Sequence, residues 1–221
     1  ALSSDEVNRI MAEIQKDPIV HYKFDGDFTN SGTQLITTEL INTPVISNKF
    51  KRGTGSMFLE NNTKGIEIPN NPLAGLNQIT FSMWVYWTGL GIPTNAEPHF
   101  LFQSSAISIR PQTATTLRVY VANGVTWGYY YEVPFVKADW VNKWFHFTCT
   151  IDYSLTNQVA KVFLNGVELS GTHNNTLNIT EYPTSTAKFG IGVENSSGNY
   201  TNGTIGYIDD FRIYDKALDA N

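Results

Sequence analysis

Two adjacent aspartates, Asp209 and Asp210, stand inside the last apolar stretch of the chain and are the residues best placed to do chemistry. Counting by two along a strand from Ile205 puts Asp209 on the same face as Phe211 and Ile213, so we expect its carboxylate on the buried face. An unpartnered carboxylate out of water is costly, so it neutralises itself, joins a network or binds a cation. Asp209 is therefore a candidate for a metal site or a polar network.

A second group of residues could stack on a ligand. These aromatic residues stand at strand ends or in a strand with rings on both faces; the candidates are Trp87, Trp127, Tyr130 and Trp140. Sugar rings present C–H faces that stack on aromatic planes, while polar side chains bind the hydroxyl groups. Alternation puts Trp127 and Tyr129 on one face of their strand and Tyr130 on the other. The open alternative is that these rings pack at the rim beneath long loops.

No pattern of nucleophiles, bases or metal ligands indicates catalysis. Most other carboxylates are scattered singly among turns and strands, and His21, His99 and His173 show no metal-like spacing. Neither a serine nor Cys149 sits in a nucleophile-elbow motif. Cys149 alternates with apolar residues and is the only cysteine, so we expect it in the core without a disulfide.

The elements that must position these residues are mostly strands. In 221 residues, Thr, Asn, Tyr, Phe and Gly are plentiful, and about a dozen short apolar runs lie between turn residues. This pattern predicts an all-β fold, a two-sheet antiparallel jelly-roll sandwich, in one domain over residues 18–221. Asn165-Gly166 predicts a hairpin turn because both residues tolerate positive φ.

One helix is expected, at the N-terminus. Ser3 with Glu6 forms a capping-box pattern, apolar residues follow at helical spacing, and Pro18 ends the pattern. We interpret residues 1–17 as this helix, docked on the sandwich or belonging to the tail of a preceding repeat. The chain opens with Ala1-Leu2 and closes with a similar Ala-Leu pair, which leaves open a tandem array with neighbouring domains as partners.

Charge excludes two classes of partner. The formal net charge is −5, and no run of basic residues would bind a phosphate backbone or an anionic lipid surface. No apolar stretch approaches the roughly 20 residues that cross a bilayer as a helix. We therefore expect neither nucleic acid binding nor membrane insertion.

Three groups of segments together resemble the laminin-G-like jelly-roll modules of the concanavalin A-like lectin/glucanase superfamily. The first holds an opening strand and an Asp/Asn/Gly-rich loop, the second the central strands and the hairpin, and the third the final strand. They are 21–27 (HYKFDGD) with 30–32 (NSG); 79–85 (ITFSMWV) with 144–147 (WFHF) and 162–166 (VFLNG); and 207–214 (YIDDFRIY) with 217–218 (AL). The resemblance spans residues 19–218 and implies the concanavalin A-like sandwich.

The resemblance also implies a structural calcium ion. In such modules a calcium often ties the loop after the first strand to the start of the last strand, which nominates Asp25, Asp27, Asn30 and Asp209. Calcium takes six to eight hard oxygens, which carboxylates, an amide and loop carbonyls can supply. The alternative is that residues 25–26 form a turn, Asp27 is solvated and Asp209 accepts backbone hydrogen bonds.

Other family positions point away from catalysis. Trp84, Trp144 and His146 match framework positions of the family, so the resemblance implies packing or structural roles for them. Glucanases of the superfamily carry a closely spaced Glu-x-Asp-x-x-Glu triplet for acid and nucleophile work. No such triplet occurs here, so we expect no enzyme activity.

These observations lead to one functional hypothesis and one alternative. We expect a non-catalytic binding module, located outside the cell or on a cell or virion surface, that recognises carbohydrate or a glycoprotein. The alternative is a structural or adhesion domain of a bacterial adhesin or of a phage or virus fibre that makes protein–protein contacts without binding free sugar. The fold alone does not separate them, since it hosts many functions.

Overall fold

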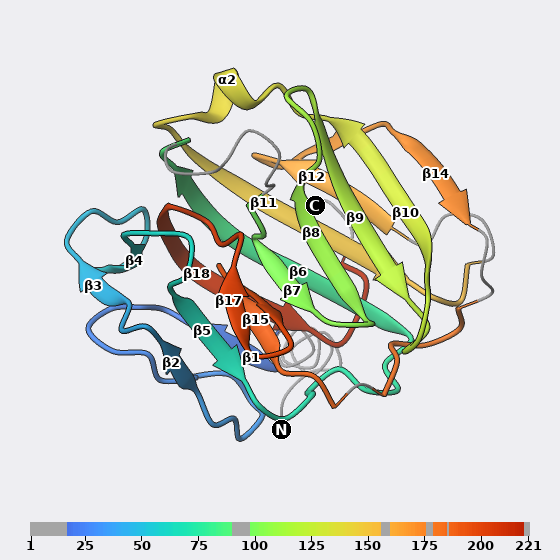
Figure 1. Ribbon diagram of the computed structural model, residues 1–221, viewed down its shortest axis with the longest axis horizontal. Helices are drawn as coiled ribbons and strands as arrows, with labels where there is room; N and C mark the ends of the chain where they lie inside the picture. The colour runs from blue at the N-terminus through green and yellow to red at the C-terminus, as the bar shows by residue number, and fades with distance from the viewer. Residues whose placement is uncertain (1–16, 90–97, 156–159, 176–178, 185, 219–221) are drawn as a thin grey trace, which may run out of the picture.

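The computed structural model describes residues 17–89, 98–155, 160–175, 179–184 and 186–218, and the predicted N-terminal helix lies outside them. Two antiparallel sheets pack face to face as a sandwich (Figure 1). Sheet A contains β13 (Val167–Leu169), β12 (Ala160–Leu164), β11 (Trp144–Asp152), β6 (Gln78–Trp87), β18 (Gly206–Tyr214), β4 (Ser56–Leu59) and β3 (Val45–Ser47) in spatial order, with β1 (Val20–Tyr22) also paired to β18. The predicted two-sheet jelly roll is confirmed.

Sheet B forms the second layer. In spatial order it contains β14 (Thr172–Asn175), β10 (Trp127–Pro134), β9 (Thr116–Ala122), β8 (Ile107–Pro111), β7 (Leu101–Gln103), β15 (Phe189–Ile191), β5 (Gly65–Ile68) and β2 (Glu39–Ile41). A small hairpin of β16 (Glu194–Ser196) and β17 (Asn199–Thr201) and the one-turn helix α2 (Lys137–Trp140) complete the described elements. No helix in these parts of the chain is long and apolar enough to span a bilayer.

Period-two alternation builds the core between the sheets. In β6 the residues Phe81, Met83 and Val85 are buried, while Ser82 and Trp84 point to the opposite face. The neighbouring strand β11 buries its own alternate residues, including Cys149, whose expected place in the core is thereby confirmed. The predicted Asn-Gly turn also joins β12 to β13, with both of its residues at positive φ.

A β-bulge interrupts the alternation in the last strand. Asp209 pairs with Trp84 and Arg212 pairs with Ser82, so three steps along β18 match two along β6. Asp210 takes φ 49° at this point. A bulge inserts one extra residue into one strand and changes which face the following side chains occupy.

The bulge corrects the predicted position of Asp209. Phe211 and Ile213 lie in the core, as expected, but Asp209 shares the outer face of sheet A with its partner Trp84. The expectation that Asp209 faces the core is therefore wrong. Its side chain is nevertheless fully buried, because a loop covers it from outside.

A second bulge lies in β10. The register shifts between Trp127, which pairs with Ala122, and Tyr129, which pairs with Val121. Tyr129 is in the core, whereas the Trp127 ring makes an edge contact with Tyr120, at 6.0 Å between centroids, and is 41% exposed. The prediction that Trp127 and Tyr129 share a face is wrong, because the extra residue turns Trp127 outward.

The loop that covers Asp209 comprises residues 48–55 and is called here the β3–β4 loop. The Oδ2 atom of Asp209 accepts hydrogen bonds from the backbone N–H groups of Lys51 at 2.7 Å and Arg52 at 2.8 Å. The carboxylate of Asp25 accepts hydrogen bonds from the backbone N–H groups of Thr54 and Gly55. Two carboxylates from distant parts of the chain therefore fasten the two halves of one loop.

Gly53 makes the second contact possible. Its φ is +60°, and a Cβ added there would lie 2.0 Å from an oxygen of Asp25. Only a residue without a side chain allows the loop to wrap the carboxylate so closely.

The pH dependence of stability tests the burial of Asp209. Burial raises the pKa of Asp209 to about 6, against the opposing effect of the N–H groups of Arg52 and Lys51. Because the folded state then holds this proton more tightly than the unfolded state, the contribution of Asp209 to stability is present below about pH 4 and lost as the pH rises through 6. In thermal melts, Asp209→Asn should therefore gain stability relative to the wild type between pH 4 and 7. A difference that stays constant with pH, or that falls, would contradict this, and Asp27→Asn controls for the loss of one charge.

Gly53→Ala tests the contact with Asp25. Gly75→Ala is the matched control, since Gly75 has φ +76° and an added Cβ would meet nothing within 4 Å. The control should lose about 1–2 kcal/mol of unfolding free energy from backbone strain. Gly53→Ala should lose more, by about 0.5–1.5 kcal/mol for each hydrogen bond broken at Asp25, in urea unfolding. Equal losses in the two variants would show that Asp25 does not hold the loop.

Candidate functional site

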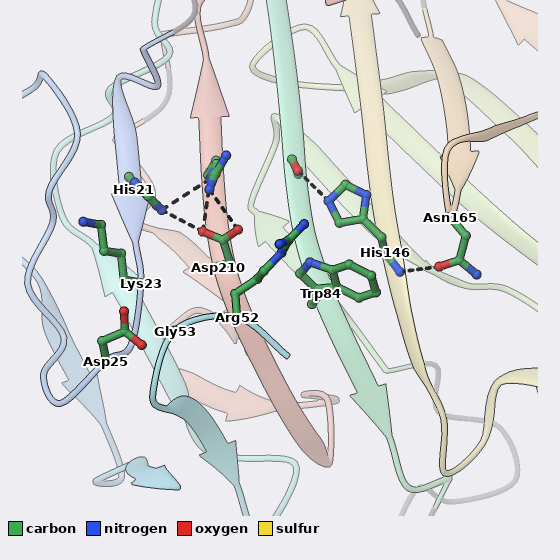
Figure 2. Close-up of a pocket in the computed structure, with 11 residues that line it drawn as sticks. His21, Lys23, Asp25, Arg52, Gly53, Trp84, His146, Asn165 and Asp210 are labelled. Carbon is green, nitrogen blue, oxygen red and sulfur yellow. Dashed lines mark hydrogen bonds and ion pairs between the residues drawn. The ribbon is translucent and has the colours of Figure 1, made fainter. Parts of the chain in front are cut away.

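A cleft of about 760 Å³ opens on the outer face of sheet A. Its floor is formed by β1, β18, β6 and β11, and the β3–β4 loop closes one side (Figure 2). We call it the sheet A cleft. Its lining is mostly polar and charged, with one large ring, and comprises His21, Lys23, Asp25, Arg52, Gly53, Ser82, Trp84, His146, Asn165, Asp210 and Arg212.

An ion-pair network occupies the β1–β18 side of the cleft. The bulge in β18 places Asp210 between two basic side chains: its Oδ1 lies 2.7 Å from Nε2 of His21, and its Oδ2 lies 2.9 Å from a guanidinium nitrogen of Arg212. Burial alone would raise the pKa of Asp210, but the hydrogen bond from His21 and the charge of Arg212 hold that pKa below its usual value. Asp210 is therefore ionised, and both of its carboxylate oxygens are paired with His21 or Arg212.

The β6–β11 side combines an aromatic ring with neutral polar groups. The Trp84 ring lies 5.0 Å from the His146 ring, and Nε2 of His146 lies 3.0 Å from the hydroxyl of Ser82. The backbone N–H of His146 donates to the side-chain oxygen of Asn165, in the turn between β12 and β13. Burial lowers the pKa of His146, and the charges of Arg212 and Arg52 lower it further. The imidazole is therefore neutral near pH 7 and can both donate and accept a hydrogen bond.

Two cations at the rim of the cleft have no ion-pair partner among the described residues. Lys23 and Arg52 are exposed, and neither forms a salt bridge with another described residue. Figure 2 shows Arg52 extending from the β3–β4 loop over the strands. Lys51 in the same loop places its ammonium 4.9 Å from the centre of the Trp84 ring. The cleft thus offers a ligand hydrogen-bond donors and acceptors, positive charges that are not paired with a carboxylate, and the ring of Trp84.

The structure brings together only part of the predicted metal set. Asp25 and Asp209 both accept hydrogen bonds from the β3–β4 loop, and Oδ1 of Asp209 is buried without a hydrogen-bond partner. Asp27 is exposed and accepts from Thr29 N–H, while the side-chain oxygen of Asn30 accepts from the backbone N–H groups of His21 in β1 and of Gly32. Among the described residues, no group of three or more acidic, histidine or cysteine side chains could hold a metal ion.

The four predicted ligand-stacking residues separate into two places. Trp87 is 4% exposed and Trp140 stacks on Phe135, so both pack at the core. Trp127 and Tyr130 lie together with Tyr120 on the outer face of sheet B. A ligand role for any of the four stays a prediction, but burial leaves Trp87 little surface on which a sugar could stack.

Sequence reasoning missed most of the sheet A cleft. Trp84 and His146 were assigned structural roles, yet they line the cleft with Ser82. The signal was present, since alternation in β6 places Ser82 and Trp84 opposite the apolar residues and therefore outward. Asp210 carried no such signal, because its orientation depends on the bulge.

The family model Laminin_G_3, described as the Concanavalin A-like lectin/glucanases superfamily, matches residues 60–221. A search of curated proteins found no relative that matches the chain. The expected resemblance is therefore confirmed by the family comparison rather than by a close relative.

Several solved structures share the fold. The binding domain of botulinum neurotoxin serotype G superposes with a TM-score of 0.68 at 17% identity over 92% of this chain, which spans only about half (49%) of that domain. Domain 4 of AbnA, an extracellular GH43 arabinanase from Geobacillus stearothermophilus solved with arabinotriose, gives a TM-score of 0.64 at 20% identity over 92% of this chain and 95% of that one. The binding domain of botulinum neurotoxin DC in complex with rat synaptotagmin II gives 0.62 at 14% identity over 94% and 50%.

At these identities the structural likeness shows the fold, and the family match shows the descent. Architecture, strand order and family model agree over most of the chain. The chain therefore belongs to the Laminin_G_3 family of the Concanavalin A-like lectin/glucanases superfamily.

Proposed function

We propose that this chain is a non-catalytic, extracellular module that binds carbohydrate, or a glycosylated partner, through the sheet A cleft. The observation that carries the proposal is the half-buried Trp84 ring flanked by His146, Ser82 and Arg52 in one cleft. A sugar needs an aromatic plane for its C–H face and several fixed donors and acceptors for its hydroxyl groups. This cleft supplies both within one concave surface.

The two carboxylates of the cleft argue for binding rather than glycoside cleavage. Hydrolysis needs one carboxyl group with a raised pKa as acid and a second carboxylate as base or nucleophile. Here Asp25 is engaged by loop N–H groups, and the pKa of Asp210 is lowered by His21 and Arg212. Neither is poised to protonate a leaving group.

The AbnA domain supports the sugar assignment by analogy. It is nearly coextensive with this chain and was solved with a bound arabino-oligosaccharide. It also comes from an extracellular enzyme, and the botulinum domains come from toxins, which supports a location outside the cell.

A protein partner is the second candidate. The botulinum DC binding domain was solved in complex with synaptotagmin II, so this fold also presents surfaces to proteins. This chain spans half of that domain. Free oligosaccharide binding separates the two candidates.

Trp84→Ala tests the cleft. Trp144 lies on the same outer face of sheet A, contacts Tyr86 and Tyr207, and does not line the cleft, so Trp144→Ala is the matched control. On a glycan array, and in calorimetry with arabinotriose as the probe, Trp84→Ala should weaken binding by about two- to twelve-fold, because ring stacking contributes roughly 0.5–1.5 kcal/mol. The control should bind like the wild type. If the wild type binds no glycan, or if Trp84→Ala binds as well as the wild type, the proposal fails.

We keep the structural calcium as a proposal with its own test. The orphan Oδ1 of Asp209, and the binding of Asp25 to the same β3–β4 loop, support an ion near that loop, although the side-chain oxygen of Asn30 already accepts two backbone hydrogen bonds. Calcium added to chelator-treated protein should raise the melting temperature, and Asp209→Asn should abolish the rise. The absence of both a calorimetric signal and a melting shift in the wild type would contradict it.

A further inference from the structure

We propose that the outer face of sheet B carries a second binding site, one that takes a saccharide with a carboxylate group. The site is a pocket of about 450 Å³ lined by His99, Ser108, Arg110, Tyr120, Trp127 and Glu194, on β7 to β10 and beneath the β16–β17 hairpin. The two sheets separate it from the sheet A cleft, so the inference goes beyond the proposed function.

Buried polar atoms without partners point to a missing ligand. The hydroxyl of Ser108 and Nε of Arg110 have no hydrogen-bond partner among the described residues, and Ser108 is only 4% exposed. An unsatisfied buried donor or acceptor costs about 1–3 kcal/mol, so a stable fold normally pairs it with protein, water or ligand. Both residues line the same pocket, as does the 1% exposed His99.

Arg110 supplies the charge that selects an anion. Its guanidinium lies 5.4 Å from the Tyr120 ring centre, and one of its terminal nitrogens lies 3.4 Å from Nε2 of His99. Arg110 forms no ion pair with another described residue. Burial lowers the pKa of His99 to about 3, and the charge of Arg110 lowers it in the same direction. His99 is therefore neutral near pH 7, and Arg110 carries the positive charge of this pair.

Glu194 is close but does not neutralise Arg110. Its carboxylate lies 3.4 Å from Nδ1 of His99, on the side of the ring away from the Nε2 that faces Arg110, and also accepts from the side chain of Asn202. A guanidinium without a carboxylate partner in a pocket is suited to a ligand carboxylate, which it can hold through two parallel N–H bonds.

The aromatic residues add a sugar-sized surface. Trp127 is 41% exposed and meets Tyr120 edge-on, so its ring forms a wall that is open to solvent. A smaller adjoining hollow is lined by Tyr120 and Trp127 together with Tyr130 and Asn174. The two hollows share the Trp127 ring, which gives room for more than one sugar unit along the face.

The ligand class follows from these three features. A uronate residue would place its carboxylate on Arg110, a hydroxyl on Ser108 and its C–H face on Trp127. Because the site lies on the sheet opposite the sheet A cleft, one module could join two glycan chains and gain avidity from both.

Trigalacturonate and its methyl ester are the matched probes, because esterification removes the charge and keeps the ring. Calorimetry should show binding of trigalacturonate, and the ester and Arg110→Gln should each weaken it by about ten- to hundred-fold, as expected for losing charge-assisted hydrogen bonds. Lys161→Gln, an exposed residue of β12, controls for the loss of one positive charge. Trp127→Phe should keep binding but lose the ligand-induced change in tryptophan fluorescence.

Three results would overturn the second site. They are no trigalacturonate binding by the wild type, equal binding of acid and ester, and loss of binding in Trp84→Ala with retention in Arg110→Gln. The last would place the uronate in the sheet A cleft and support the proposed function while removing the second site. Melting curves of each variant show whether it is folded.

Discussion

The hydrogen bonds from the Lys51 and Arg52 amides to the buried carboxylate of Asp209 hold the outer face of sheet A together. A carboxylate excluded from water must find donors, and here the donors come from a loop 157 and 158 residues away in sequence. These hydrogen bonds hold the β3–β4 loop against the outer face of sheet A. That position brings Arg52 and Gly53 to the rim of the cleft and Lys51 over Trp84.

The same constraint explains why the cleft has its mixture of groups. Asp209 and Asp210 are neighbours, but the bulge lets one accept from the loop and the other from His21 and Arg212. Without the extra residue in β18, the following side chains would change faces. The first carboxylate thus fixes the loop, and the second fixes the basic side chains that face a ligand.

Much of the fold could be predicted from the sequence, because alternation of apolar residues in β6 and β11 is regular and the Asn-Gly turn has a distinctive backbone requirement. The cleft could not, since it depends on bulges. Asp210 at φ 49° stands where no glycine or proline marks the bulge in β18, and only Gly128 marks the one in β10. A one-residue slip reverses every later assignment of faces. The partner of Asp209 was equally hidden, because backbone N–H groups have no sequence signature. The structure shows that Asp209 accepts backbone hydrogen bonds, as the open alternative expected, while the calcium ion stays a prediction.

The outer faces of both sheets place aromatic rings next to cationic side chains, although different strands form the two faces. In sheet A, Trp84 lies near Arg52 and Lys51; in sheet B, Trp127 and Tyr120 lie near Arg110. The chain as a whole carries a net charge of −5, so these cations are local and do not belong to a basic surface. Charges separated by more than about 10 Å are largely screened at ordinary salt concentrations, so such cations act on a ligand only once it has entered the pocket. The positive charge therefore favours one orientation of a bound ligand over another, while the rings provide the contact area that any sugar could use.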